Sequence, residues 1–160
     1  RRGLPNLVPT PEALAVLGEP ATAALFEKYG VLTAAELHSR CEVYKEAYEE
    51  IVSIESTCMA NMARTMLVAP CFAYARELAE TAVSLQAVGA PGEIATALAT
   101  EVATAAGELV TAIAELEASN ESKNRIEAMG KVREAADCLE HLVPGDTWPL
   151  PSYADMMFLQ

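Results

Sequence analysis

The chain has 160 residues, of which 52% are hydrophobic, and its formal net charge is −12. The apolar content excludes a disordered chain, and the acidity without a basic patch argues against nucleic acid and anionic membrane surfaces as partners. The four cysteines contain no CxxC pair. We therefore read them as reduced, semi-buried thiols of a cytoplasmic protein and not as a disulfide framework.

No uninterrupted apolar run approaches the ~20 residues that a membrane span needs. No signal peptide is present, and the chain opens without a methionine, which suggests a piece of a longer protein. Alanine is abundant, and Gly and Pro are clustered, so long stretches lack helix breakers. These features predict an α-helical domain.

The chain begins with a proline-containing segment, residues 1–9, which reads as a linker from an upstream domain. A short helix over 11–17 is expected next, because Thr10 offers an N-cap hydroxyl and Pro11 suits the first helical position. Pro20 opens a second short helix, 20–29. A glycine follows each of these helices and is expected to end it.

A long helix is predicted over residues 33–87. Its start is the capping box that Thr33 and Glu36 form, and Pro70 inside it predicts a kink. Its apolar side chains recur at spacings of three, four or seven: Leu37, Cys41, Tyr44, Tyr48, Ile51, Cys58 and Met62. The same register places Glu55 on this stripe. Beyond the proline, the apolar positions are Phe72, Leu78, Val83 and Leu85.

Two more helices follow the turn at residues 88–92. The third long pattern, 93–118, has an inward face of Ile94, Leu98, Val102, Ala105, Leu109, Ile113 and Leu116. Ser119 and Asn120 are expected to cap a helix over 121–142, whose inward face is Ile126, Met129, Val132, Ala136, Leu139 and Val143. The tail, 144–160, is irregular, with a turn of helix that Ser152 caps.

These elements predict an all-α fold, with residues 10–143 forming an antiparallel helical bundle or a long helical hairpin. The irregular tail would dock on it. The sequence has no internal repeat of fixed period. It also lacks a phosphate-cradling glycine loop, a Walker motif, an HExxH motif and a nucleophile elbow, which argues against independent catalysis.

Two Cys/His pairs are candidate metal ligands. His38 and Cys41 share a helix face, as do Cys138 and His141, and together they would make a Cys2His2 zinc set if the two helix ends met. A simple bundle keeps them apart, so the favoured interpretation is surface histidines beside half-buried thiols. A di-iron site is disfavoured, because neither histidine has a Glu three residues earlier. Asp137 and His141 are spaced to form a weak pair.

Glu55 and a run of Met and Tyr side chains are the other candidates. A buried Glu55 would need a partner, which could be Arg64, Arg76 or a group across a subunit interface. A slight rotation of the helix would instead leave it at the edge of the stripe, and a substrate contact is disfavoured. The Met and Tyr side chains could form part of the core, which we favour, or line a promiscuous binding groove. They are Tyr44, Tyr48, Met59, Met62 and Met66.

The tail concentrates apolar and aromatic side chains that would be sticky in water. They are Trp148, Leu150, Tyr153, Met156, Met157 and Phe158. The tail is therefore expected to dock on this bundle or on another part of a parent chain.

Three segments in different parts of the chain form a recognisable set: residues 1–14 (RRGLPNLVPTPEAL), Leu25 to Ala63 (LFEKYGVLTAAELHSRCEVYKEAYEEIVSIESTCMANMA) and Trp148 to Phe158 (WPLPSYADMMF). On these segments the chain resembles the C-terminal part of type III glutamine synthetases, and the resemblance covers nearly the whole chain. Cys41 departs from the aromatic residue expected there.

The resemblance implies a parent enzyme that joins ammonia to glutamate with ATP and a divalent metal such as Mg²⁺. Its catalytic motifs belong to an upstream β-rich domain, so no catalytic, cofactor-binding or metal-binding residue is assigned to this chain. The resemblance also implies two stacked hexameric rings, in which a helical extension would serve assembly, stabilisation or regulation. A free-standing helical interaction module and a metal-binding bundle are the alternatives.

Overall fold

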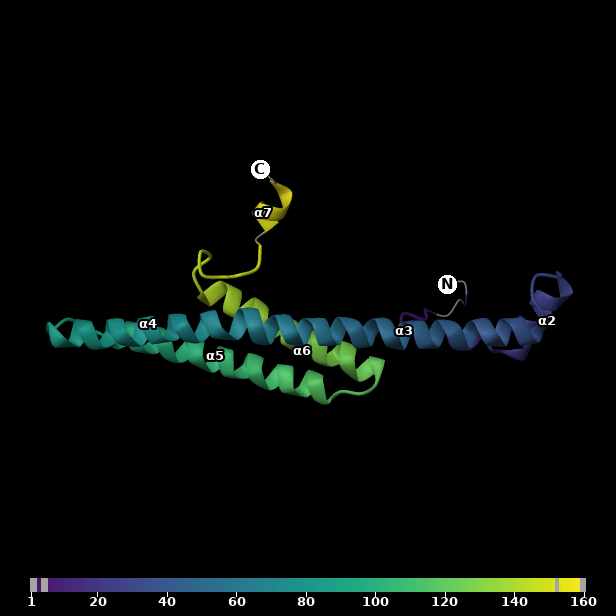
Figure 1. Ribbon diagram of the computed structural model, residues 1–160, viewed down its shortest axis with the longest axis horizontal. Coiled ribbons are helices and arrows are strands. Elements are labelled where there is room, and N and C mark those ends of the chain that lie inside the picture. Colours follow the sequence, from purple (N-terminus) through teal and green to yellow (C-terminus); the bar gives the residue numbers. More distant parts are fainter. Residues whose placement is uncertain (1–2, 4–5, 152, 159–160) are drawn as a thin grey trace. The chain divides into compact units, whose positions relative to one another are not determined.

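The computed structural model describes residues 3, 6–151 and 153–158. These residues form helices joined by short loops, and no strand occurs among them, which confirms the all-α class. The elements are α1 (Thr10–Leu17), α2 (Pro20–Lys28), α3 (Ala34–Met62), a π-helical turn η1 (Ala63–Leu67), α4 (Val68–Ala87), α5 (Glu93–Ala118), α6 (Ser122–Leu142) and α7 (Tyr153–Met157) (Figure 1). The chain divides into two compact units, Arg1–Ile54 and Glu55–Gln160, and the boundary falls inside α3.

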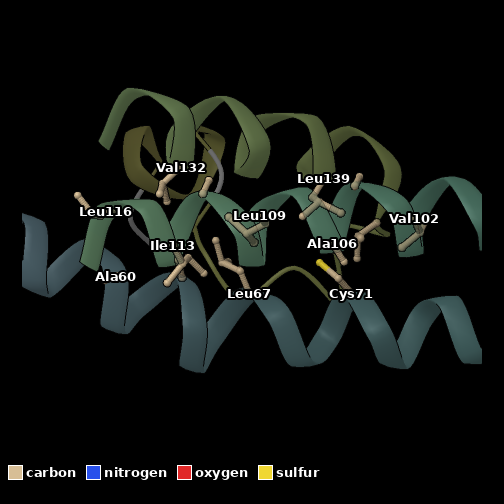
Figure 2. Packing of buried hydrophobic residues seen from close by; sticks show 14 of the residues in the cluster. Ala60, Leu67, Cys71, Val102, Ala106, Leu109, Ile113, Leu116, Val132 and Leu139 are labelled. Carbon is tan, nitrogen blue, oxygen red and sulfur yellow. The ribbon is translucent and has the colours of Figure 1, made fainter. Parts of the chain in front are cut away.

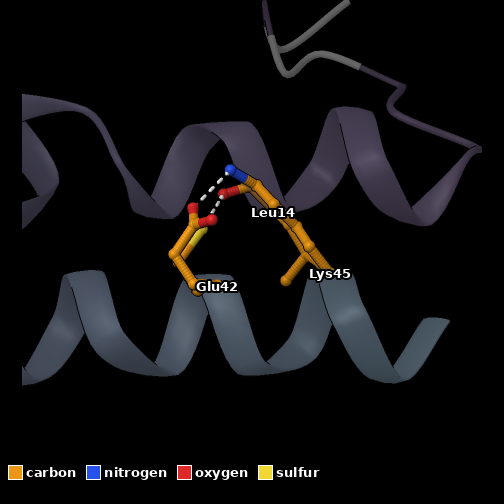
Figure 3. Close-up of polar contacts among 4 residues, drawn as sticks. Leu14, Glu42 and Lys45 are labelled. Atoms are coloured by element: carbon orange, nitrogen blue, oxygen red, sulfur yellow. Dashed lines mark hydrogen bonds and ion pairs between the residues drawn. The ribbon is translucent and has the colours of Figure 1, made fainter. Parts of the chain in front are cut away.

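The first unit holds α1, α2 and the greater part of α3. Its buried apolar side chains are Leu14, Leu37, Cys41 and Val52. The Cys41 thiol donates a hydrogen bond to the carbonyl of Leu14 at 3.2 Å, and beside it Lys45 Nζ pairs with Glu42 at 2.9 Å (Figure 3). This pairing lowers the pKa of the Glu42 carboxyl and raises that of Lys45.

The ends of the short helices follow local chemistry. The capping box is confirmed, because Thr33 N–H donates to Glu36 Oε2 at 2.8 Å and Glu36 N–H donates to Thr33 Oγ1 at 3.3 Å. Gly30, at φ 62°, ends α2 with hydrogen bonds from Gly30 N to Glu27 O and from Val31 N to Phe26 O. Only a residue without Cβ adopts this left-handed geometry at little cost.

Two predicted caps are wrong. Pro9, and not Thr10, is the N-cap of α1, because its carbonyl already accepts the first helical hydrogen bond, from Ala13 N–H. At α6 the N-cap is Glu121, without a side-chain cap. The Ser119 hydroxyl instead donates to Glu115 O at 2.9 Å and so belongs to the end of α5.

The second unit is built on α5, which packs against α4 along one side and α6 along the other. Figure 2 shows Leu109 and Ile113 of α5 between the long helix, which contributes Leu67 and Cys71, and α6, which contributes Val132 and Leu139. Alanines fill many of the remaining core positions: Ala60, Ala63, Ala75, Ala105, Ala106, Ala112 and Ala128. Their small side chains let the helix backbones approach closely.

Several side chains predicted to face inward are exposed. They are Phe72, Val83, Ile94, Leu98 and Ile126. The buried run of α5 begins only at Val102, so the first turns of α5 and the last turns of α4 form a two-helix end with large apolar groups in solvent. The core of this end is the alanine Ala82, which periodicity of large side chains does not reveal.

The long helix is irregular before Pro70 and not at it. In η1 the N–H of Val68 bonds to Ala63 O, five residues back, which defines a π-helical turn. Pro70 lacks an N–H, and in a regular helix its ring clashes with the carbonyl four residues earlier, that of Met66. A widened turn just upstream relieves such a clash, so the helix continues into α4.

Among the described helices, α5 alone is long and apolar enough to cross a membrane by length and composition. Its apolar residues instead have packing partners in α4 and α6. Glu101, Glu108 and Glu115 recur every seventh residue on its exposed surface. We therefore treat α5 as the core helix of the second unit.

Candidate functional site

An apolar groove of about 680 Å³ opens on the second unit. One wall is the end of α3 with η1, the other is α6, and the tail closes one side. The lining residues are Glu55, Cys58, Met59, Met62, Ala63, Leu67, Met129, Val132, Arg133, Ala136, Asp137, Glu140, Leu150, Pro151 and Met156.

Methionine dominates the apolar lining of the groove. Met59, Met62, Met129 and Met156 come from three different parts of the chain, and Met62 and Met156 are 42% and 52% exposed. Methionine side chains are unbranched and polarizable, so they adapt their shape to an apolar partner. The groove floor continues into the core through the buried Leu67 and Val132.

The charged residues of the groove lie on its two helical walls. Glu55 belongs to α3, and Arg133, Asp137 and Glu140 belong to α6. Arg133 Nε pairs with Asp137 Oδ2 at 3.4 Å. Three carboxylates against one guanidinium leave the rim acidic, so it favours positive charge in whatever the groove contacts.

The comparisons with known proteins agree with the resemblance in the sequence. The glutamine synthetase C-terminal domain family matches residues 1–86, more than half of the chain. The chain belongs to this family.

Three curated glutamine synthetases match 99% of this chain. The type-3 glutamine synthetase of Dictyostelium discoideum is 28% identical, with 24% of its own length covered. The glutamine synthetases of Butyrivibrio fibrisolvens and Bacteroides fragilis (strain YCH46) are each 26% identical, with 25% of their length covered. The chain therefore spans about a quarter of these relatives. No solved structure matches it.

The family match of this glutamine synthetase C-terminal domain ends at residue 86, in the last turn of α4. It contains the α3 and η1 wall of the groove, whereas α6 and the tail lie beyond it and are covered by the matches to whole relatives. The predicted membership of the type III glutamine synthetases is thereby confirmed.

Glu55 lies at the edge of its helix face, which was one of the alternatives for this residue. It is exposed and lines the groove. The proposed pairing with an arginine is wrong, because Arg64 pairs with Glu117 at 2.5 Å and Arg76 with Glu80 at 3.7 Å.

The Cys/His pairs lie in different units. Cys41 is buried and bonded to the Leu14 carbonyl, and His38 is exposed. His141 Nδ1 contacts the Asp137 backbone oxygen at 2.6 Å, so these two residues do pair, through the carbonyl of Asp137, while the Asp137 carboxylate pairs with Arg133. Within the described ranges no three His, Cys, Asp or Glu side chains gather as a metal site.

The core interpretation of the Met and Tyr side chains is wrong for most of them. Tyr44, Met62 and Met66 are exposed, and Tyr48 and Met59 are half-buried. Met59 and Met62 line the groove, which is the alternative that the sequence left open.

The tail docks in part. Trp148 is buried, and Leu150 is half-buried against the core of the same unit. Met156, Met157 and Phe158 in and after α7 remain exposed. Ser152, the predicted cap of this helix, and the Tyr153 side chain lie outside the described parts of the chain.

The sequence analysis named Met129, Ala136 and Asp137 of the α6 wall but missed Arg133 and Glu140. Met129, Arg133, Ala136 and Glu140 follow one another at spacings of four, three and four. These spacings place them on one helical face, which is the signal that could have found them. That face lies beside the buried face that contains Val132 and Leu139.

Proposed function

We propose that this chain is the non-catalytic helical C-terminal part of an enzyme that makes glutamine from glutamate and ammonia with ATP. The observation that carries the proposal is the family match over residues 1–86, together with glutamine synthetases that match 99% of the chain. The reaction, with its ATP and divalent metal, would belong to the remaining three-quarters of such an enzyme.

The role proposed for this part is assembly, stabilisation or regulation of the enzyme. Its support is structural, because the second unit has an apolar groove and an exposed apolar tail in which Met157 and Phe158 are 73% and 72% exposed. Apolar surface of this kind marks interaction sites. Residues 1–9 would link it to the catalytic domain, and the oligomer would be built from identical chains.

The compartment is proposed to be the cytoplasm. All four cysteines are free, and Cys58 and Cys138 are exposed. Exposed free thiols persist where the surroundings are reducing.

The test compares the full-length enzyme with a form that lacks residues 33–160. Analytical ultracentrifugation measures the assembly, and glutamine formation from glutamate, ammonia and ATP measures the activity. We expect a smaller assembly. Unchanged mass with unchanged activity would reject the structural role.

A milder variant guards against simple misfolding of the truncated enzyme. Removing only residues 153–160 leaves the core cluster intact, because its last members are Trp148 and Leu150. The isolated 160-residue chain is assayed in parallel with ATP and Mg²⁺. Glutamine formation by that chain alone would contradict the non-catalytic assignment.

A further inference from the structure

The groove on the second unit has the length of a helix-binding site. Its lining residues run from Glu55 to Leu67 on one wall and from Met129 to Glu140 on the other. At 1.5 Å per residue each wall extends over about 16–18 Å, which matches three turns of a docked helix. A small molecule would need only part of this length.

The chemistry of the lining specifies the kind of helix. The methionines offer an adaptable apolar floor, as in proteins that accept the apolar face of amphipathic helices. Of the rim acids, Asp137 is paired with Arg133, whereas Glu55 and Glu140 form no ion pair with any described residue. These two carboxylates lie on opposite walls.

Charge argues against a second copy of this chain as the occupant. The chain carries 23 acidic and 11 basic residues, so the acidic surface of a second copy is a poor electrostatic match for the acidic rim. A helix with lysines or arginines beside its apolar face would be attracted both by the rim and by the whole acidic surface.

We propose that this groove binds an amphipathic, basic helix of a different protein chain. The apolar face of that helix lies on Met59, Met62 and Met129, and its basic side chains pair with Glu55 and Glu140. Met156, in the exposed helix α7, covers the bound helix from the side of the tail. The proposal goes beyond the proposed function and does not depend on it.

The test uses the 160-residue chain with isotope-labelled methionine methyl groups. The probe is an 18-residue peptide of leucine and lysine in a helical pattern, and its control has glutamate in place of every lysine. The chain has six methionines. We expect saturable shifts at Met59, Met62, Met129 and Met156, and none at Met66, which does not line the groove.

Matched variants distinguish binding in the groove from unspecific attraction of the basic peptide to the acidic surface of the chain. Met62→Gln should weaken binding of the basic peptide roughly tenfold, as loss of one anchor residue does. Met66→Gln, one turn further along and 37% exposed, should leave it unchanged. Glu140→Lys should also weaken binding and its salt dependence, while Glu134→Lys on another face of α6 should do so much less.

Each other outcome overturns the proposal. Equal affinity for the acidic and basic peptides would remove the charge argument. Methyl shifts that appear on concentrating the chain without peptide would identify a second copy as the occupant. Shifts with octyl glucoside but not with the peptide would identify a small amphiphile, and no shifts with either would mean that the groove has no ligand of this class.

Discussion

Replacing Leu109 by alanine should destabilise the second unit strongly. The Leu109 side chain is 0% exposed and lies in the middle of α5, in contact with the core that α4 and α6 also form (Figure 2). The substitution removes three carbons, worth about 2.4 kcal/mol of transfer free energy at about 0.8 kcal/mol each. A cavity between two packed helices adds to this, so the expected loss of unfolding free energy is about 3–4 kcal/mol.

The assay is urea unfolding followed by the fluorescence of Trp148. The chain has one tryptophan, and it packs in the same core cluster, so the signal reports the second unit. Val110→Ala is the control, because this neighbour is 44% exposed. We expect no loss there, since alanine is the better helix former. Equal losses at Leu109 and Val110, or a loss below about 1 kcal/mol at Leu109, would refute the packing described.

Three further outcomes are expected. Trp148 is 8% exposed, and its Nε1 meets no acceptor among the described residues. Trp148→Phe removes this unpaired donor, so the midpoint of thermal unfolding, measured by circular dichroism, should stay unchanged or rise. Trp148→Ala leaves a cavity and should lower the unfolding free energy by about 3–5 kcal/mol. Hydrogen bonds from Thr33 lower the pKa of the Glu36 carboxyl below its ordinary value of 4.5. The stability that these bonds give to the folded chain is therefore complete above pH 4.5 and is lost as the pH falls through the lowered pKa. Thr33→Ala should raise that pKa in an NMR titration, and an unmoved value would contradict the capping box. A thiol reagent should modify the exposed Cys58 and Cys138 quickly, and the buried Cys41 and Cys71 only when the chain unfolds. Equal modification rates at all four cysteines would be inconsistent with this burial.

Local signals in the sequence predicted the helices well. The outer bounds of α1, α2, the long helix from α3 to α4, α5 and α6 lie within one residue of those expected, because Pro20, the Thr33 capping box and the glycines at 30 and 89 act through nearest neighbours. The π-helical turn that divides the long helix was not predicted. Core positions in the middle of α5, such as Leu109 and Ile113, were also predicted correctly, since both neighbouring helices cover them.

The prediction that one apolar stripe of the long helix is buried was wrong at several positions. Periodicity indicates which side chains share a face but not whether anything covers that face. Ile51 fits the pattern and is 54% exposed, whereas Cys71 and Ala75 are core residues that no count of large apolar side chains finds. The sequence left a groove at Met59 and Met62 open but did not predict its second wall on α6, because that wall comes from a helix far away in the chain.

The wide turn at Ala63–Leu67 gives the long helix one place where its length can change. Each residue of an α-helix turns the chain by about 100°, so a deletion within α4 would swing Cys71 and Ala75 away from α5. A π-helical turn carries one residue more than an α-helical turn of similar rotation. Deleting Thr65 therefore lets this segment contract to regular helix while the flanking faces keep their directions, so the chain should tolerate a gap here better than elsewhere in this helix.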